Sequence, residues 1–187
     1  MVMNIFRRRR GERTIEALYG VIVAQARDAA FYERYGVPDT VEGRFDMIVM
    51  HLALVTRRLR TEAEQGKAQA QALFDTFCLD MDHNLREMGV GDMAVPKRMK
   101  RFGEAFYGRA AAYDQALDEV NNDSGAGLVR AVGRNLFGEE EHAGARLLAA
   151  YMRNAEQALA GAKADDIARG AFRFPEPADA LASGEQR

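Results

Sequence analysis

Two pairs of acidic and histidine side chains have the spacing that could bind a metal ion. Asp80 and His83 are three residues apart, and so are Glu139 and His142. Di-metal helical bundles use an acid and a histidine at this spacing on each of two helices, with one more carboxylate from each of two others. Here the second pair lies at a predicted helix entrance, and Asp46 on an earlier helix has no evident acidic partner. Solvated polar side chains are therefore favoured over a metal site.

Other candidate motifs fail on residue type. Residues 80–84, DMDHN, begin like a calcium loop, but that loop needs glycine at its sixth position and glutamate at its twelfth, where this chain has Leu85 and Gly91. Cys78 adjoins an apolar helix stripe without an activating base and is interpreted as a packing residue. His51 follows a long apolar stretch, where a lone histidine usually bonds within the core. No catalytic, cofactor-binding or metal-ligating residue is predicted.

A cluster of basic residues lies near the start of the sequence, at positions 7–10 and 13. These arginines could contact ribosomal RNA phosphates or anionic lipid, where each basic residue contributes on the order of 1 kcal/mol. A solvated segment is an equal alternative. The 26 basic and 28 acidic residues give a net charge of −2, so the whole chain has no attraction to nucleic acid or an anionic membrane. Any such contact must be local.

A second basic cluster occupies the first turns of a predicted helix. It consists of Lys97, Arg98, Lys100 and Arg101. Cations at a helix start oppose the helix dipole by roughly 0.3 to 1 kcal/mol each and call for a compensating partner. The nearby acids that could supply it are Asp80, Asp82, Glu87 and Asp92. The sequence leaves two interpretations open, a charge network between two antiparallel helices and a docking surface.

Helices must carry these residues, because apolar residues recur at steps of three and four and no long segment alternates as a half-buried strand would. The predicted helices are 12–26, a short piece through Tyr35, a long helix to about Glu64, then about 67–88, 96–120, a helix ending near Leu136, and 140–160. Arg57, Arg58 and Arg60 complement the dipole at the end of the long helix.

Turn and cap residues mark the ends of several of these helices. Asp39 and Glu42 form an acidic capping box at the start of the long helix. Gly89 is placed as a left-handed helix stop, and Asp123 or Ser124 could cap the helix that ends near Leu136.

The fold class predicted is all-α, a single compact bundle of about six helices that is irregular rather than a simple four-helix bundle. A length of 187 residues suits one domain, and 48% apolar with 29% charged residues excludes disordered and fibrous classes. Residues 1–11 are predicted as a flexible basic leader, 12–174 as the helical domain and 175–187 as a flexible tail.

Targeting signals and disulfides are not predicted. No stretch approaches the ~18 to 20 consecutive apolar residues of a membrane-spanning helix, and the basic start is not followed by an apolar run as in a signal peptide. One cysteine fits a reducing compartment. The chain is therefore expected to stay in the cytoplasm.

Two segments resemble the ubiquinol-cytochrome c chaperone family. They are GRFDMIVMHLALVTRRLR at 43–60 and DMDHNLREMGVGDMAVPKRMKRFGEAFYGRAAAYD at 80–114, and the likeness extends from about Glu12 to Phe174. The family includes the mitochondrial assembly factor for cytochrome b and its short alphaproteobacterial relatives. The sequence has no long N-terminal presequence, so the resemblance implies a bacterial short form.

The resemblance implies an assembly chaperone rather than an enzyme. The expected partner is newly made, unassembled cytochrome b, held until it enters the ubiquinol-cytochrome c reductase (bc1) complex. A small helper factor, the ribosome and peripheral contact with the inner face of the inner membrane are further expected partners, with no DNA and no cofactor. A helical metal- or quinone-handling enzyme and a ribosome- or RNA-contacting factor are the alternatives.

The resemblance also suggests which residues contact a partner or shape the charged surface. The candidates are Arg44, Asp46, His51, Asp80, Asp82, Asn84, Arg86, Glu87, Asp92, Lys97, Lys100 and Tyr107. Flexible methionines adapt to varied apolar helices, and those available are Met47, Met50, Met81, Met88, Met93 and Met99. Core packing is the alternative role for most of these methionines.

Overall fold

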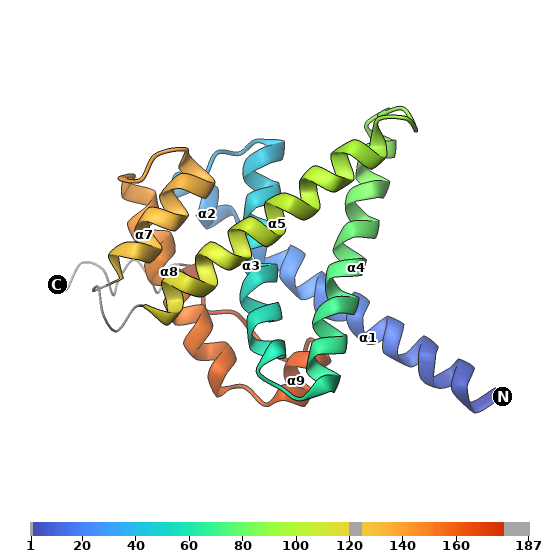
Figure 1. The fold of residues 1–187 in the computed structure, drawn as a ribbon. Coiled ribbons are helices and arrows are strands. Elements are labelled where there is room, and N and C mark those ends of the chain that lie inside the picture. Colours follow the sequence, from blue (N-terminus) through green and yellow to red (C-terminus); the bar gives the residue numbers. More distant parts are fainter. Residues whose placement is uncertain (1, 120–124, 178–187) are drawn as a thin grey trace.

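The computed structural model describes residues 2–119 and 125–177, and their side chains apart from those of 2–10 and 12. All regular secondary structure in these ranges is helical, which confirms the predicted all-α class. In chain order the elements are α1 (Val2–Ala26), α2 (Ala29–Glu33), α3 (Val41–Arg60), α4 (Glu64–Glu87), α5 (Val95–Asp118), α7 (Ala126–Val132), the π-helix η1 (Gly133–Phe137), α8 (Ala143–Gly161) and α9 (Ala164–Ala168). Figure 1 shows the long helices crossing one another around α3, the irregular packing that the sequence predicts.

Helix α3 is the centre of the core. Every residue from Asp46 to Thr56 is buried, so the apolar stripe predicted for this segment is in fact a helix covered on all sides. A helix that is apolar around its circumference belongs inside a protein. Helices α1, α4, α5 and α8 all pack against α3, and these contacts supply the cover.

The start of α3 differs from the predicted capping box. The cap is Thr40, whose hydroxyl accepts a hydrogen bond from the Gly43 amide at 3.1 Å. The predicted cap, Asp39, is wrong; its carboxylate instead accepts a hydrogen bond from Arg44 Nε at 2.6 Å. A side chain at Gly43 would collide with the Pro38 carbonyl, so only glycine fits this tight entry.

Helices α4 and α5 form an antiparallel pair joined by the turn that the sequence predicts. Gly89 has a φ of +76° and ends α4, and Pro96 lies in the first turn of α5. An aromatic layer holds the pair against α3. Phe45 stacks on Phe102 with ring centroids 4.8 Å apart, and the Phe74 and Phe106 centroids are also 4.8 Å apart.

A local hydrogen bond determines where α8 begins. Helix α8 starts at Ala143 rather than Glu140, because His142 is its cap: Nδ1 accepts a hydrogen bond from the Gly144 amide at 3.1 Å. The His142 ring also stacks on Phe137 at a centroid distance of 3.9 Å. The predicted caps at positions 123 and 124 lie outside the described residues.

The C-terminal part of the described chain contacts the end of α1 and the segment that follows α2. Helix α1 begins at Val2, ten residues before the predicted start, and the flexibility predicted for residues 1–11 stays a prediction. Gln25 Nε2 donates a hydrogen bond to the Pro175 carbonyl at 3.4 Å, and the Tyr35 hydroxyl donates to the Pro177 carbonyl. Residues 178–187, the rest of the predicted tail, lie outside the described residues.

Candidate interaction surface

Two neighbouring hollows open on the surface formed by α3, α4, α5 and α8. The first, of about 400 Å³, is lined by Leu54, Arg57, Arg58, Arg60, Thr61, Asp114, Asp118, Glu156, Leu159 and Ala160. The second, of about 380 Å³, is lined by Thr56, Arg60, Lys67, Ala70, Gln71, Phe74, Phe106, Tyr107, Ala110, Ala111 and Asp114. Arg60 and Asp114 belong to both and form an ion pair at 2.6 Å, so this pair separates a charged hollow from an aromatic one.

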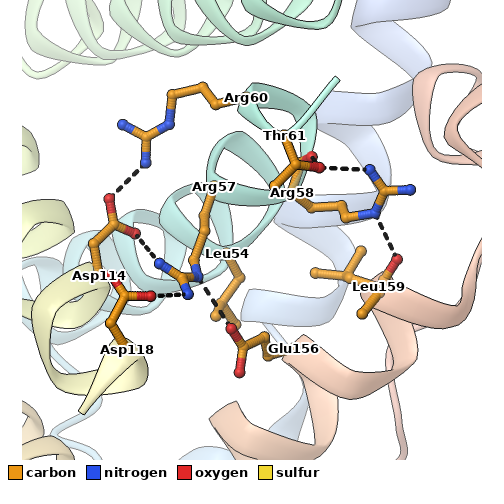
Figure 2. Close-up of a pocket in the computed structure, with 10 residues that line it drawn as sticks. Leu54, Arg57, Arg58, Arg60, Thr61, Asp114, Asp118, Glu156 and Leu159 are labelled. Atoms are coloured by element: carbon orange, nitrogen blue, oxygen red, sulfur yellow. Dashed lines mark hydrogen bonds and ion pairs between the residues drawn. The ribbon is translucent and has the colours of Figure 1, made fainter. Parts of the chain in front are cut away.

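Arg57 is the centre of the charged hollow (Figure 2). Its guanidinium donates to Asp118 at 2.6 Å and to Glu156 at 3.0 Å, and it lies 3.6 Å from Asp114. Burial opposes the charge on Arg57, but the hydrogen bonds to Asp118 and Glu156 outweigh it, and the pKa of the guanidinium is raised. The hollow contains both positive and negative side chains, and these largely neutralise one another.

Arg58 connects the end of α3 to the end of α8. Its guanidinium donates to the Leu159 carbonyl at 3.0 Å (Figure 2). It also donates to the Ala162 carbonyl at 3.2 Å and pairs with Glu62. The last carbonyls of a helix have no partner within the helix, so Arg58 satisfies them. The sequence predicts only that these arginines complement the dipole of α3, because their partners lie far along the chain.

The aromatic hollow contains one of the predicted contact residues, Tyr107. This side chain is 57% exposed, and its ring lies 5.1 Å from Phe74 and 5.3 Å from Phe106, measured between centroids. Ala110 and Ala111 leave room beside the rings. An exposed ring over a small-residue floor can accept an apolar side chain from another molecule.

The predicted acidic residues of α4 are engaged locally. Arg86 binds Asp82 and Asp92, both at 2.6 Å, and His83 lies 3.1 Å from Glu87. The hydrogen bond from Arg86 lowers the pKa of Asp82. The charge network that the sequence leaves open between α4 and the basic cluster of α5 is therefore not formed by these described residues, which pair within α4 and its turn.

The other two predicted polar residues of α4 tie the helix to itself and to α1. The Tyr19 hydroxyl donates to Asp80 Oδ2 at 2.7 Å, and Asn84 Nδ2 donates to the Asp80 carbonyl at 2.8 Å. Burial, together with the hydrogen bond to Asp80, raises the pKa of Tyr19. Asp80 thus fixes α1 to α4.

The basic cluster of α5 faces solvent. Lys97, Arg98 and Arg101 are exposed and form no ion pair within the described part of the chain, whereas Lys100 lies 3.7 Å from Glu104. Exposed pairs at such distances contribute little to stability. Of the two interpretations of this cluster, the arrangement favours a docking surface.

The predicted residues of α3 lie in different environments. Arg44 is exposed, pairs with Asp39 and holds its guanidinium 5.6 Å from the centre of the Tyr32 ring. Asp46 is buried and its Oδ1 lies 2.8 Å from Arg109 Nη2. Burial raises the pKa of Asp46 to about 6, although Arg109 opposes the shift.

His51 is fully buried, as its apolar surroundings in the sequence indicate. Its Nδ1 lies 2.8 Å from the Met47 carbonyl, which can only accept, so Nδ1 carries the proton and Nε2 accepts from the Tyr151 hydroxyl at 2.9 Å. Burial lowers the pKa of His51 to about 4, which keeps the ring neutral. In this conformation His51 and Asp46 do not reach the surface directly.

The methionines divide between core and surface. Met47, Met50 and Met81 are buried, whereas Met88 and Met93 at the end of α4 and in the following turn are 57% and 97% exposed. The two exposed methionines lie at the α4–α5 end, where most of the predicted partner-contact residues also lie. Tyr107 lies further along α5, in the aromatic hollow.

The described residues contain no group of three or more histidine, cysteine or acidic side chains arranged to hold a metal ion. None of their helices is both long enough and apolar enough to span a bilayer.

These features define the class as an all-α protein with two neighbouring hollows and a positively charged helix end. The chain belongs to the ubiquinol-cytochrome c chaperone family, whose model matches residues 33–174. The match begins at the end of α2 and includes both hollows and the α4–α5 end.

Similarity to individual proteins supports the same family membership. The chain is 26% identical over 139 residues to ubiquinol-cytochrome c reductase complex assembly factor 1 of Mus musculus, covering 73% of this chain and 46% of the mouse protein. The Xenopus laevis factor is 24% identical over 139 residues, covering 73% and 68%. The chain spans about half the length of the mouse and human relatives. The crystal structure of the Cbp3 homolog from Brucella abortus is 37% identical, with a TM-score of 0.81 over 95% of this chain and 98% of that chain.

Proposed function

We propose that this protein binds newly made cytochrome b and assists biogenesis of the ubiquinol-cytochrome c reductase complex, without catalysing a reaction itself. The observation that carries the proposal is the family match over residues 33–174, together with relatives that are named assembly factors of that complex. A small helper factor and the ribosome are further partners under this proposal, with the protein acting in the cytoplasm at the inner face of the membrane.

The paired hollows suit a membrane-protein client. An unassembled membrane protein presents apolar helix surfaces beside polar loops, and both must be covered before assembly. The aromatic hollow offers Phe74, Phe106 and Tyr107 to apolar side chains. The adjoining hollow offers Arg60 and Asp114, whose ion pair can exchange partners with a polar loop.

The predicted site residues take different roles under this proposal. Those with exposed side chains, which can contact a client or helper directly, are Arg44, Arg86, Glu87, Asp92, Lys97, Lys100 and Tyr107. Those that are buried or half-buried shape the surface from behind, and they are Asp46, His51, Asp80, Asp82 and Asn84. Tyr107 is the strongest candidate for direct contact, because it combines exposure with a neighbouring hollow.

Deletion of the gene for this protein tests the proposal. We expect mature bc1 complex to fall while the cytochrome b transcript is unchanged. Complementation with the wild type should restore the complex, Tyr107→Ala should restore it incompletely, and Val41→Ala should restore it fully, because Val41 is 65% exposed but lies in neither hollow. Normal bc1 levels in the deletion strain would remove the proposal.

A further inference from the structure

The end of the α4–α5 pair carries two exposed methionines. Met88 is 57% exposed, and Met93 in the turn is 97% exposed. Figure 1 shows this turn projecting from one end of the molecule, away from α7 and α8. Large apolar side chains this exposed at a projecting turn add nothing to the core, so folding does not account for them.

The same end has an excess of positive charge. Residues 82–101 contain five cations and three carboxylates, although the whole chain has a net charge of −2. Arg86 binds two of the three carboxylates, those of Asp82 and Asp92. Lys97, Arg98 and Arg101 are left exposed without an ion pair in the described part of the chain.

The position of these cations makes them unfavourable within the molecule. Lys97 and Arg98 lie in the first turn of α5, where the positive end of the helix dipole repels them. The described residues provide no carboxylate that would compensate either cation. A negatively charged surface outside the molecule would compensate them, and this is the complementarity on which the inference rests.

We propose that the α4–α5 end is a membrane contact that binds the surface of an anionic phospholipid bilayer. Lys97, Arg98 and Arg101 contact headgroup phosphates, and Met93 enters the interface between headgroups and acyl chains. A projecting end meets a flat surface, so the three cations and the methionine can reach it together. Outside residues 82–101 the chain is acidic on balance, although it includes the separate arginine cluster at positions 7–10 and 13.

The surface chemistry favours a bilayer over RNA. Single-stranded RNA is bound by exposed aromatic rings that stack on bases. Residues 88–101 at this end include no aromatic side chain. A thioether beside unpaired cations suits a lipid interface better than a base.

The inference does not depend on the proposed function. Lipid binding is measured on the purified protein, whereas cytochrome b assembly is measured in cells, so either can fail alone. If both hold, the membrane contact keeps the protein at the bilayer in which a membrane-protein client resides.

Sedimentation with phospholipid vesicles tests the charges. We expect the full chain at low ionic strength to bind phosphatidylcholine vesicles containing phosphatidylglycerol, to bind pure phosphatidylcholine weakly, and to be released by salt. Each basic residue near an anionic surface contributes about fivefold to partitioning, so replacing Lys97, Arg98 and Arg101 with Gln should lower it on the order of 100-fold.

A matched variant controls for net charge. Arg34, Arg146 and Lys163 are exposed and lie on other elements, so their replacement with Gln removes the same charge elsewhere. We expect this variant to bind vesicles as the wild type does. Equal loss of binding in both variants, or no binding of the wild type to anionic vesicles, would overturn the proposal.

The chain contains no tryptophan, which allows a direct probe of the methionine. In Met93→Trp the single indole reports its own environment, and the high exposure of Met93 means that the fold tolerates the change. We expect a blue shift of the emission on adding anionic vesicles and none on adding pure phosphatidylcholine. An unshifted spectrum with vesicle-bound protein would show that the turn stays in water and would contradict the contact.

Discussion

The polar residues of α3 and those of the α4–α5 end are both charged or titratable, but their partners differ. Asp46, His51 and Arg57 of α3 are bound by side chains of α5 and α8, about 60 to 100 positions away along the chain. At the α4–α5 end, Arg86 pairs within six residues and Lys97 forms no ion pair in the described chain. The first set holds the helices together, whereas the second leaves its charge available to a partner.

The difference shows that a cluster of cations in sequence has no fixed meaning. The arginines at the end of α3 meet carboxylates that the fold delivers from α5 and α8. Lys97, Arg98 and Arg101 at the start of α5 meet none among the described residues. The comparison predicts that changes in α3 affect folding stability and that changes at the α4–α5 end affect binding instead.

The largest expected effect is on the acid sensitivity contributed by His51. Its pKa is about 4 in the folded protein against 6.5 ordinarily, so between these values the unfolded chain binds the proton more strongly. Stability from this group is therefore present above pH 6.5 and is lost as the pH falls toward 4. Between pH 7 and 4.5 the loss should be about 2 to 3 kcal/mol.

Urea unfolding of the wild type and His51→Gln at both pH values measures this effect. Asp46, whose raised pKa acts in the opposite direction, is common to both proteins, so the difference between them isolates His51. The wild type should lose more stability on acidification than the variant. Identical pH dependence in the two proteins would break the assignment of His51 to a buried, neutral state.

A smaller loss is expected for Arg57→Ala. The change leaves Glu156 without its partner in a half-buried site, whereas Asp114 keeps its ion pair with Arg60 and Asp118 is already solvated. We expect the free energy of unfolding to fall by about 1 to 2 kcal/mol, measured by urea denaturation at pH 7. Arg34→Ala, an exposed arginine outside this network, is the control. If the two variants lost equal stability, the network of α3 would not differ from an ordinary surface.

The smallest effect is expected from the triple replacement of Lys97, Arg98 and Arg101 with Gln. Because Lys97 and Arg98 oppose the dipole of α5, removal of the three cations should leave the free energy of unfolding unchanged or raise it by about 1 kcal/mol. The melting temperature of this triple variant, measured by thermal unfolding and compared with that of the wild type, tests the expectation. A marked fall in its melting temperature would show that the cluster has a folding partner after all.

Local patterns in the sequence account for most of the helices but not for how they are covered. Periodicity places α3, α4 and α5, and Gly89 and Pro96 mark the turn between the last two. The cap of α3 falls on Thr40 rather than Asp39, because neighbouring residues of similar capping ability are distinguished by backbone geometry. Burial of α3 on every side depends on four other helices, which its own sequence does not reveal.

The candidate surface was predictable in part for the same reason. Tyr107 and the exposed cations of α5 lie on the surface as the resemblance suggests. The charged hollow was not predicted, since Arg57 meets acids from α5 and α8 that only the folded chain brings together. His51 follows the local pattern, which places a lone histidine in an apolar stretch within the core.

Photocrosslinking in cells tests the central claim most directly. A photoreactive amino acid at position 107, beside the aromatic hollow, should capture newly made cytochrome b, and the same probe at the exposed position 41 should not. Capture at 107 that disappears when cytochrome b synthesis is stopped is the predicted result. Absence of cytochrome b from the products at 107, or equal capture at both positions, would contradict the account.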